Sequence, residues 1–170
     1  MYTCACDIQN AYLQSPSSEK HFIICGPEFG LENVGKKSLI IFSLYVGKCA
    51  GAFYWRHVRS TMDEMRFESF KADRDVWFRY AMKYNSTDYY QHVLLYTDNV
   101  LAIMENPEYF IRHDQSKIFV VEPNSILPPT QYLVNEVSYV TLENDLNAWS
   151  FRSFQYVQDT VKNVINTLAQ

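Results

Sequence analysis

The sequence lacks any block of Lys or Arg. Its 15 basic residues are outnumbered by 19 acidic residues, which gives a formal net charge of −4. A protein that binds nucleic acid on its own usually neutralises phosphates with a basic stripe on its surface. The charge balance therefore argues against autonomous nucleic-acid binding.

Long hydrophobic runs are also missing, because nowhere do 18 apolar residues follow one another. The start, MYTCACDIQ, has neither the basic segment nor the apolar core of a secretion signal. A membrane-spanning helix and a signal peptide each need such a segment. We therefore expect an intracellular protein, cytoplasmic or nuclear, that does not enter a membrane.

Cysteine is scarce, and the 4 Cys and 4 His do not have the spacing of a common zinc module. One C-x-C pair is present but no C-x2-C pair, so a zinc site is the weaker of two interpretations. Small buried thiols in a reducing compartment are the stronger one. The residues concerned are Cys4, Cys6, Cys25 and Cys49, with His21, His57, His92 and His113.

Apolar and aromatic side chains, in contrast, are abundant. Hydrophobic residues make up 48% of the chain and aromatic residues 16%, with 13 Tyr and 11 Phe. This composition is far from the low hydrophobicity and high charge of disordered sequences. At 170 residues, the chain has the length of one globular domain with a substantial core.

Hydrophobic periodicity predicts more strands than helices. Helical spacing is clearest over 52–66, where Tyr54, Val58, Met62 and Met65 share one face. Further helices are expected at 107–119, with a proline at the first position, and at 153–168. Adjacent strands with few helices between them favour an α+β fold with an antiparallel-rich sheet. Strand-like runs occupy 2–7, 21–27, 37–45, 75–82, both halves of 89–107, 118–122, 131–143 and 148–151.

Two carboxylates stand at the ends of apolar strands. Asp7 ends the first strand, and Asp98 lies between the two apolar halves of YYQHVLLYTDNVLAIMENP. A tight turn at Asp98 and Asn99 is one interpretation, because both residue types tolerate left-handed backbone conformations. The other is a site where the two strand ends converge. Carboxylates that converge repel each other, and a divalent ion such as Mg²⁺ relieves that repulsion.

Five motifs in order resemble those of a copia-type retrotransposon reverse transcriptase and cover nearly the whole chain. They are DIQNAYLQ, LYVGKCAGAFYW, KADRDVWF, LLYTDNVL and QYLVNE. The resemblance implies an RNA-directed DNA polymerase with a palm-type antiparallel sheet, two packed helices, and a C-terminal hairpin and helix. Residues 1–130 then correspond to a partial fingers and palm region, and 131–170 to the primer-grip hairpin and the beginning of the thumb.

The resemblance also implies roles for individual residues. Asp7 and Asp98 match the catalytic aspartates that hold Mg²⁺ or Mn²⁺, and Ile8 matches a position whose backbone carbonyl helps to bind metal. Tyr12 matches the aromatic residue that discriminates against a ribose 2′-OH, with core packing as its alternative role. The remaining matches are the nucleotide and template contacts Tyr45, Gly47, Lys48 and Tyr96, and the primer-grip residues Tyr132 and Leu133.

The chain departs from the family pattern at four motif positions. Asn99 stands where the family has a second hairpin aspartate, so one potential metal ligand carries no charge. Val46 and Val134 stand at glycine positions, and Glu122 stands near a position that usually holds lysine. The family's upstream fingers segment is also expected to be missing, because only six residues precede Asp7.

Three functions follow as hypotheses. The first is an active polymerase that copies an RNA template from a DNA primer. The second, which the departures favour, is a decayed polymerase fragment with weak or no activity, in effect a pseudoenzyme. The third is a reused palm that acts as a protein-interaction module. The resemblance implies a polyprotein with protease, integrase and ribonuclease H as the wider partner.

Overall fold

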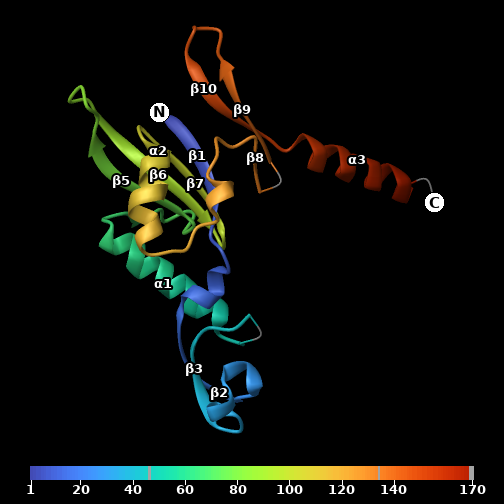
Figure 1. The fold of residues 1–170 in the computed structure, drawn as a ribbon. Helices are drawn as coiled ribbons and strands as arrows, with labels where there is room; N and C mark the ends of the chain where they lie inside the picture. The colour runs from blue at the N-terminus through green and yellow to red at the C-terminus, as the bar shows by residue number, and fades with distance from the viewer. Residues whose placement is uncertain (46, 134, 169–170) are drawn as a thin grey trace.

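The computed structural model describes residues 1–45, 47–133 and 135–168. The fold is mixed α+β, with mostly antiparallel sheets and few short helices (Figure 1). This agrees with the α+β class expected from the order of strands and helices. None of the described helices is long and apolar enough to cross a membrane.

A five-stranded sheet forms the centre of the molecule, with the strand order β1-β7-β6-β5-β4. Every neighbouring pair in it is antiparallel. The predicted pairing of 75–82 with 89–96 is confirmed, since Trp77 lies opposite Val93 in that hairpin. The strands are β1 (Tyr2–Asp7), β4 (Glu68–Ser69), β5 (Val76–Met82), β6 (Asp88–Tyr96) and β7 (Asn99–Met104).

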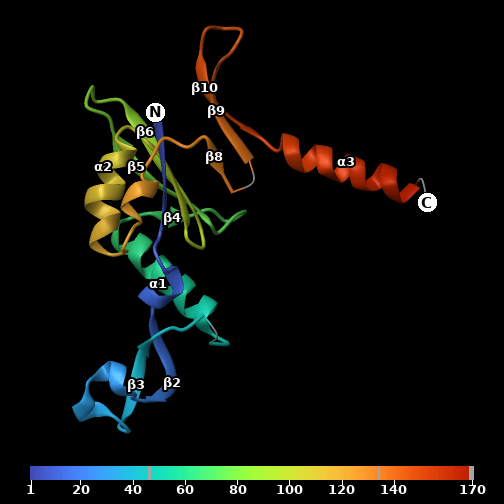
Figure 2. The same ribbon diagram turned by 45° about the vertical axis from the view of Figure 1, so that its right-hand side comes forward.

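Helix α1 (Ala50–Glu64) covers one face of this sheet (Figures 1 and 2). Its buried residues include Tyr54, Val58 and Met62, which lie on the predicted apolar face. They join one large core cluster with strand residues such as Trp77 and Val93. The 3.6-residue period therefore identified the helix and three residues of its buried face, whereas Met65, the fourth expected member, lies just beyond the helix as its C-cap residue and is only partly buried.

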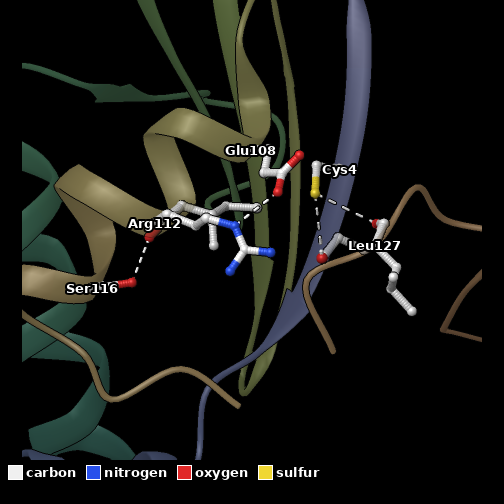
Figure 3. Close-up of polar contacts among 7 residues, drawn as sticks. Cys4, Glu108, Arg112, Ser116 and Leu127 are labelled. Carbon is white, nitrogen blue, oxygen red and sulfur yellow. Dashed lines mark hydrogen bonds and ion pairs between the residues drawn. The ribbon is translucent and has the colours of Figure 1, made fainter. Parts of the chain in front are cut away.

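The second expected helix, 107–119, is not continuous. It consists of the short α2 (Pro107–Tyr109), a π turn (Phe110–Asp114) and a 3₁₀ turn (Gln115–Lys117). Ser116 donates a hydrogen bond to the Ile111 carbonyl at 2.6 Å, and the same carbonyl accepts from the Gln115 amide (Figure 3). The expected strand at 118–122 is reduced to an isolated bridge between Ile8 and Val121.

A three-stranded sheet of order β10-β9-β8 packs near the other face. Its residues Tyr132 and Val137 form a small buried cluster with Leu101 of β7. The strand expected over 131–143 is interrupted, because Leu133 has a positive φ of 54°. The strands are β8 (Gln131–Tyr132), β9 (Asn135–Thr141) and β10 (Asn147–Arg152).

Two elements project from this body in different directions (Figures 1 and 2). One is the hairpin of β2 (Pro16–Ile24) and β3 (Lys37–Phe42), with 3₁₀ turns at Pro27–Phe29 and Leu31–Asn33 between its strands. The other is α3 (Phe154–Leu168). The apolar stripe predicted for this helix is exposed and consists of Val157, Val161, Val164, Ile165 and Leu168.

Candidate functional site

The antiparallel register brings the two predicted aspartates to one end of the sheet. Asp7, the last residue of β1, lies opposite Asn99, the first residue of β7. The last residue pair between β6 and β7 is Tyr96 with Asn99, so only Thr97 and Asp98 connect the two strands. Asp98 is therefore in the turn next to the residue that faces Asp7.

The turn at this hairpin differs by one residue from the turn expected at Asp98 and Asn99. Asn99 is in β7, and Thr97 is the residue with a positive φ, of 55°. A β-branched residue rarely adopts such a conformation. The Thr97 carbonyl accepts a hydrogen bond of 2.7 Å from the Tyr54 hydroxyl, which ties the turn to α1.

Backbone hydrogen bonds attach three segments of the chain to this end of the sheet. The Ile8 amide donates to the Asp98 carbonyl at 2.7 Å, and Ile8 itself is buried. The Glu122 amide donates to the Asp7 carbonyl at 2.8 Å. The Asp7 amide in turn donates to the Ser125 hydroxyl at 2.8 Å. The position of Asp7 is therefore fixed by its backbone, which leaves the carboxylate side chain exposed.

The charges around Asp7 repel its carboxylate. Its pKa is raised above the ordinary value, mainly by partial burial and further by the negative charges of Asp98 and Glu122. The Asn99 amide donates to the Asp98 carboxylate at 3.0 Å. Asn99, at the start of β7, thus donates a hydrogen bond to the turn, where an aspartate would add a further charge.

A divalent cation fits this arrangement, because it would relieve the repulsion between Asp7 and Asp98. Mg²⁺ in proteins is commonly held by one or two carboxylates together with substrate phosphates and water. Among the described residues, no group of three or more His, Cys, Asp or Glu could hold a metal ion. Among the described residues, the ligands to such an ion would therefore be the two carboxylates and backbone oxygens. The interpretation of the cysteines as a zinc site gains no support from the described residues.

Three predicted contact residues are aromatic. The Tyr12 ring is half-buried and lies 5.1 Å from the Tyr45 ring and 5.4 Å from the Tyr54 ring, between centroids. Tyr96 is exposed at the end of β6. A cavity of about 170 Å³ is lined by Tyr12, Tyr96 and Thr97 among others. Tyr12 thus packs against neighbouring rings and also borders a cavity, which leaves both of its predicted roles open.

The loop before α1 carries the predicted contacts Gly47 and Lys48. The Gly47 amide donates to the Leu44 carbonyl at 2.9 Å, and a Cβ atom at Gly47 would lie 3.1 Å from that oxygen. A side chain here would crowd the loop, whereas the Lys48 side chain is exposed. Val46, one of the departures from the family pattern, lies outside the described residues.

The predicted primer-grip residues are in different environments. Tyr132 is buried, and its hydroxyl lies 3.3 Å from the Leu94 carbonyl and 3.4 Å from the Asn99 carbonyl. It therefore supports the hairpin from the second sheet. Leu133 is 40% exposed. Val134 lies outside the described residues.

Sequence reasoning missed two groups that support the site. The Tyr54 hydroxyl holds the turn, and the Ser125 hydroxyl accepts from the Asp7 amide. Helical spacing placed Tyr54 in the core but could not indicate the partner of its hydroxyl. Ser125 is 118 residues from Asp7, and no local pattern links them.

Comparisons of the chain with protein-family models, with curated proteins and with solved structures give no match. Two carboxylates lie at adjacent strand ends, and Thr97, next to Asp98, borders the Tyr-lined cavity. Such a pair of carboxylates is suited to holding a divalent ion.

Proposed function

We propose that the chain is a decayed palm fragment of a copia-type reverse transcriptase, with weak or no polymerase activity. The observation that carries this proposal is the register of Asp7 opposite Asn99, with Asp98 in the adjoining two-residue turn. The antiparallel sheet with α1 on one face and Tyr132 supporting the hairpin from the other is consistent with a palm.

In the proposed site Asp7 and Asp98 hold Mg²⁺ or Mn²⁺, with the Ile8 carbonyl as an additional ligand. Such ions stabilise the attacking and leaving oxygens when a primer 3′-OH displaces pyrophosphate from a nucleotide. The chain's own part is to keep the two carboxylates at a fixed separation through the bonds to the Asp98, Asp7 and Thr97 backbone. Tyr12 and Lys48 are the proposed contacts to nucleotide and template.

Two features of the chain support the loss of polymerase activity. Asn99 contributes no charge, and the substitution of a group beside a metal site already costs about 10–100-fold in affinity or activity. Glu122 adds a negative charge near Asp7, which nucleotide phosphates would meet on approach. Displacement of the reacting groups by about 1 Å can lower the rate on the order of 10²-fold. Restoring one charge should therefore not restore polymerisation.

The experiment is single-nucleotide primer extension on an RNA template with Mg²⁺ or Mn²⁺. It compares the native chain, Asn99→Asp, and the same chains extended upstream by their natural reading frame. We expect Asn99→Asp to bind metal more tightly but to incorporate negligible nucleotide, with Asp7→Asn as the inactive control. Vigorous incorporation by Asn99→Asp alone would contradict decay at several positions.

A protein-interaction module is the second candidate, because the β2–β3 hairpin exposes apolar side chains on one face. Phe22, directly opposite Leu39, is 49% exposed, and Leu39 is 51% exposed. Exposed apolar patches often mark protein interfaces. Sedimentation of the native chain and Leu39→Ser tests this role: concentration-dependent association that the substitution abolishes favours it, and a monomer throughout argues against self-association through this face.

A further inference from the structure

Two apolar surfaces on the described part of the chain are open to solvent. The α3 stripe consists of residues that are between 51% and 82% exposed: Val157, Val161, Val164, Ile165 and Leu168. The hairpin face, on β2 and β3, consists of residues that are between 49% and 67% exposed: Phe22, Ile24, Leu39 and Ile41. Exposed apolar patches of this kind mark interaction sites.

Strand pairing places the residues of the hairpin face on one side of the hairpin. Phe22 lies directly opposite Leu39, and side chains two positions apart along a strand point the same way, so Ile24 and Ile41 are on that side too. Lys37 joins them, with its Nζ atom 4.3 Å from the centre of the Phe22 ring. A two-stranded sheet is at best marginally stable in water by itself. A partner on the hairpin face would therefore stabilise it.

Helix α3 also depends on packing. Six of its 15 residues are β-branched, which lowers the helix propensity. Isolated helices of this length are marginal in water even when they are rich in alanine. Val157, Val161, Val164 and Leu168 follow one another at steps of four, three and four residues, which gives a narrow apolar seam for one opposing surface.

The hairpin of the same chain is not within reach of α3. Only Ser153 separates β10 from α3, and the Ser153 hydroxyl donates a hydrogen bond to the Asn135 side chain. The Ser153 carbonyl accepts from the Val157 amide at 3.0 Å, so the helix continues directly from this anchored residue. Figures 1 and 2 show the hairpin and α3 at different ends of the body. A second copy of the chain can bring the two kinds of surface together.

The charges favour contact between α3 and the hairpin over the pairing of like surfaces. Two hairpin faces packed together would bring two copies of Lys37 close to each other, and like charges repel. The α3 stripe is uncharged, because Asp159 and Lys162 lie one or two positions from Val161 and do not share its face. Two paired α3 helices would share only about two heptads, fewer than the three or four that are typical of a coiled coil.

The two surfaces also match in size. Val157 to Leu168 spans about 17 Å of helix, and the six residues of β3 span about 20 Å. From the exposed fractions, one contact would bury on the order of 1,000 Å² in total and two contacts about 2,000 Å². Stable interfaces bury about 1,200–2,000 Å², so two reciprocal contacts are sufficient. Reciprocal contacts between two copies also close the assembly.

We propose that α3 of one copy docks on the hairpin face of a second copy, and the reverse, in a closed two-fold dimer. This inference rests on the second candidate function, the protein-interaction module, and gives the hairpin face its occupant. Neither Asp7 nor Asp98 takes part in the contact, so the dimer is independent of metal binding.

The test is sedimentation velocity of the chain over a range of concentrations. We expect the native chain to be in equilibrium between monomer and dimer. Leu39→Lys and Val161→Glu each place a charge in both contacts of the dimer, and each should weaken it by about a hundredfold or more, because an unpaired charge is costly to bury. An equimolar mixture of the two variants should dimerise again, since one contact is then native and the other joins the two introduced charges, which are of opposite sign.

Lys162→Gln is the matched control on α3, since it changes an exposed residue off the stripe, and it should dimerise like the native chain. Asp7→Asn should do the same, which separates this proposal from the polymerase proposal. Restored association in the mixture also shows that each variant keeps one intact surface.

A native chain that stays monomeric at all concentrations would overturn the proposal. A mixture that does not associate, or species larger than a dimer, would overturn it as well. A native-like dimer of Leu39→Lys would mean that two α3 helices pair instead. A native-like dimer of Val161→Glu that Leu39→Lys abolishes would keep the interaction module but overturn the contact with α3.

Discussion

Asp7 is held by its backbone in a position that its charge disfavours. The amide and carbonyl of this residue are bonded to Ser125 and Glu122, while Asp98 and Glu122 add negative charge around its carboxylate. Residues that serve a site at the expense of stability are common in proteins. Asp7 therefore gives a residue-level test of the proposal.

Asp7→Asn should raise the thermal stability of the metal-free chain at pH 7 by a small amount. Because the pKa of Asp7 is raised in the folded state, the native carboxyl holds its proton to higher pH than the unfolded one. Stability therefore falls as pH rises from about the unfolded value of 3.8 through the raised pKa, and the loss is complete above it. Asn cannot ionise, so its advantage should be present at pH 7 and vanish below pH 3.8.

Thermal melts of both chains between pH 3 and 8, in a buffer with chelator, make this measurement. Glu68→Gln is the control, because it neutralises an exposed acid on β4 outside the site. A lower melting temperature for Asp7→Asn at pH 7 would show that the Asp7 carboxylate makes a stabilising interaction instead.

At the scale of elements, the β6–β7 hairpin carries the strain of the site. Thr97 adopts its positive φ because only two residues connect the paired ends of the strands. A left-handed conformation costs a non-glycine residue about 1–2 kcal/mol. The Tyr54 hydroxyl bond to the Thr97 carbonyl, at 2.7 Å, is one compensation.

Thr97→Gly should therefore stabilise the chain, by about 0.5–1 kcal/mol after the entropic cost of glycine. Urea unfolding of the variant and the native chain measures this difference. Thr141→Gly is a matched control on strand β9, where φ is not positive and glycine should destabilise. Destabilisation of the same size in both variants would mean that the turn is not strained.

The elements predicted from sequence were those with regular periodicity. The buried face of 52–66 and the pairing of 75–82 with 89–96 follow from apolar spacing alone. The irregular segment 107–117 did not, because apolar spacing does not distinguish an α turn from the π and 3₁₀ turns that follow it. The turn residue was also missed, since a β-branched Thr97 at positive φ runs against propensity. The location of Asp7 and Asp98 at strand ends could be predicted because both end apolar runs.

The whole molecule is acidic, with a net charge of −4. We expect weak binding to an RNA–DNA hybrid, with a slope of log affinity against log salt smaller in magnitude than about 3. Fluorescence anisotropy from 50 to 200 mM salt measures the slope. Lys48→Gln should reduce it by about 1 if Lys48 contacts a phosphate. A steep slope in the native chain would contradict the expectation.

The central claim is that Asp7 and Asp98 together hold a divalent ion, and paramagnetic broadening by Mn²⁺ tests it most directly. Mn²⁺ is titrated into the ¹⁵N-labelled chain while the amide signals are followed. We predict that the signals of Asp7, Ile8, Asp98 and Asn99 broaden first, that Asp7→Asn removes the effect, and that Asn99→Asp strengthens it. Broadening that is centred elsewhere, or that persists unchanged in Asp7→Asn, would contradict the claim.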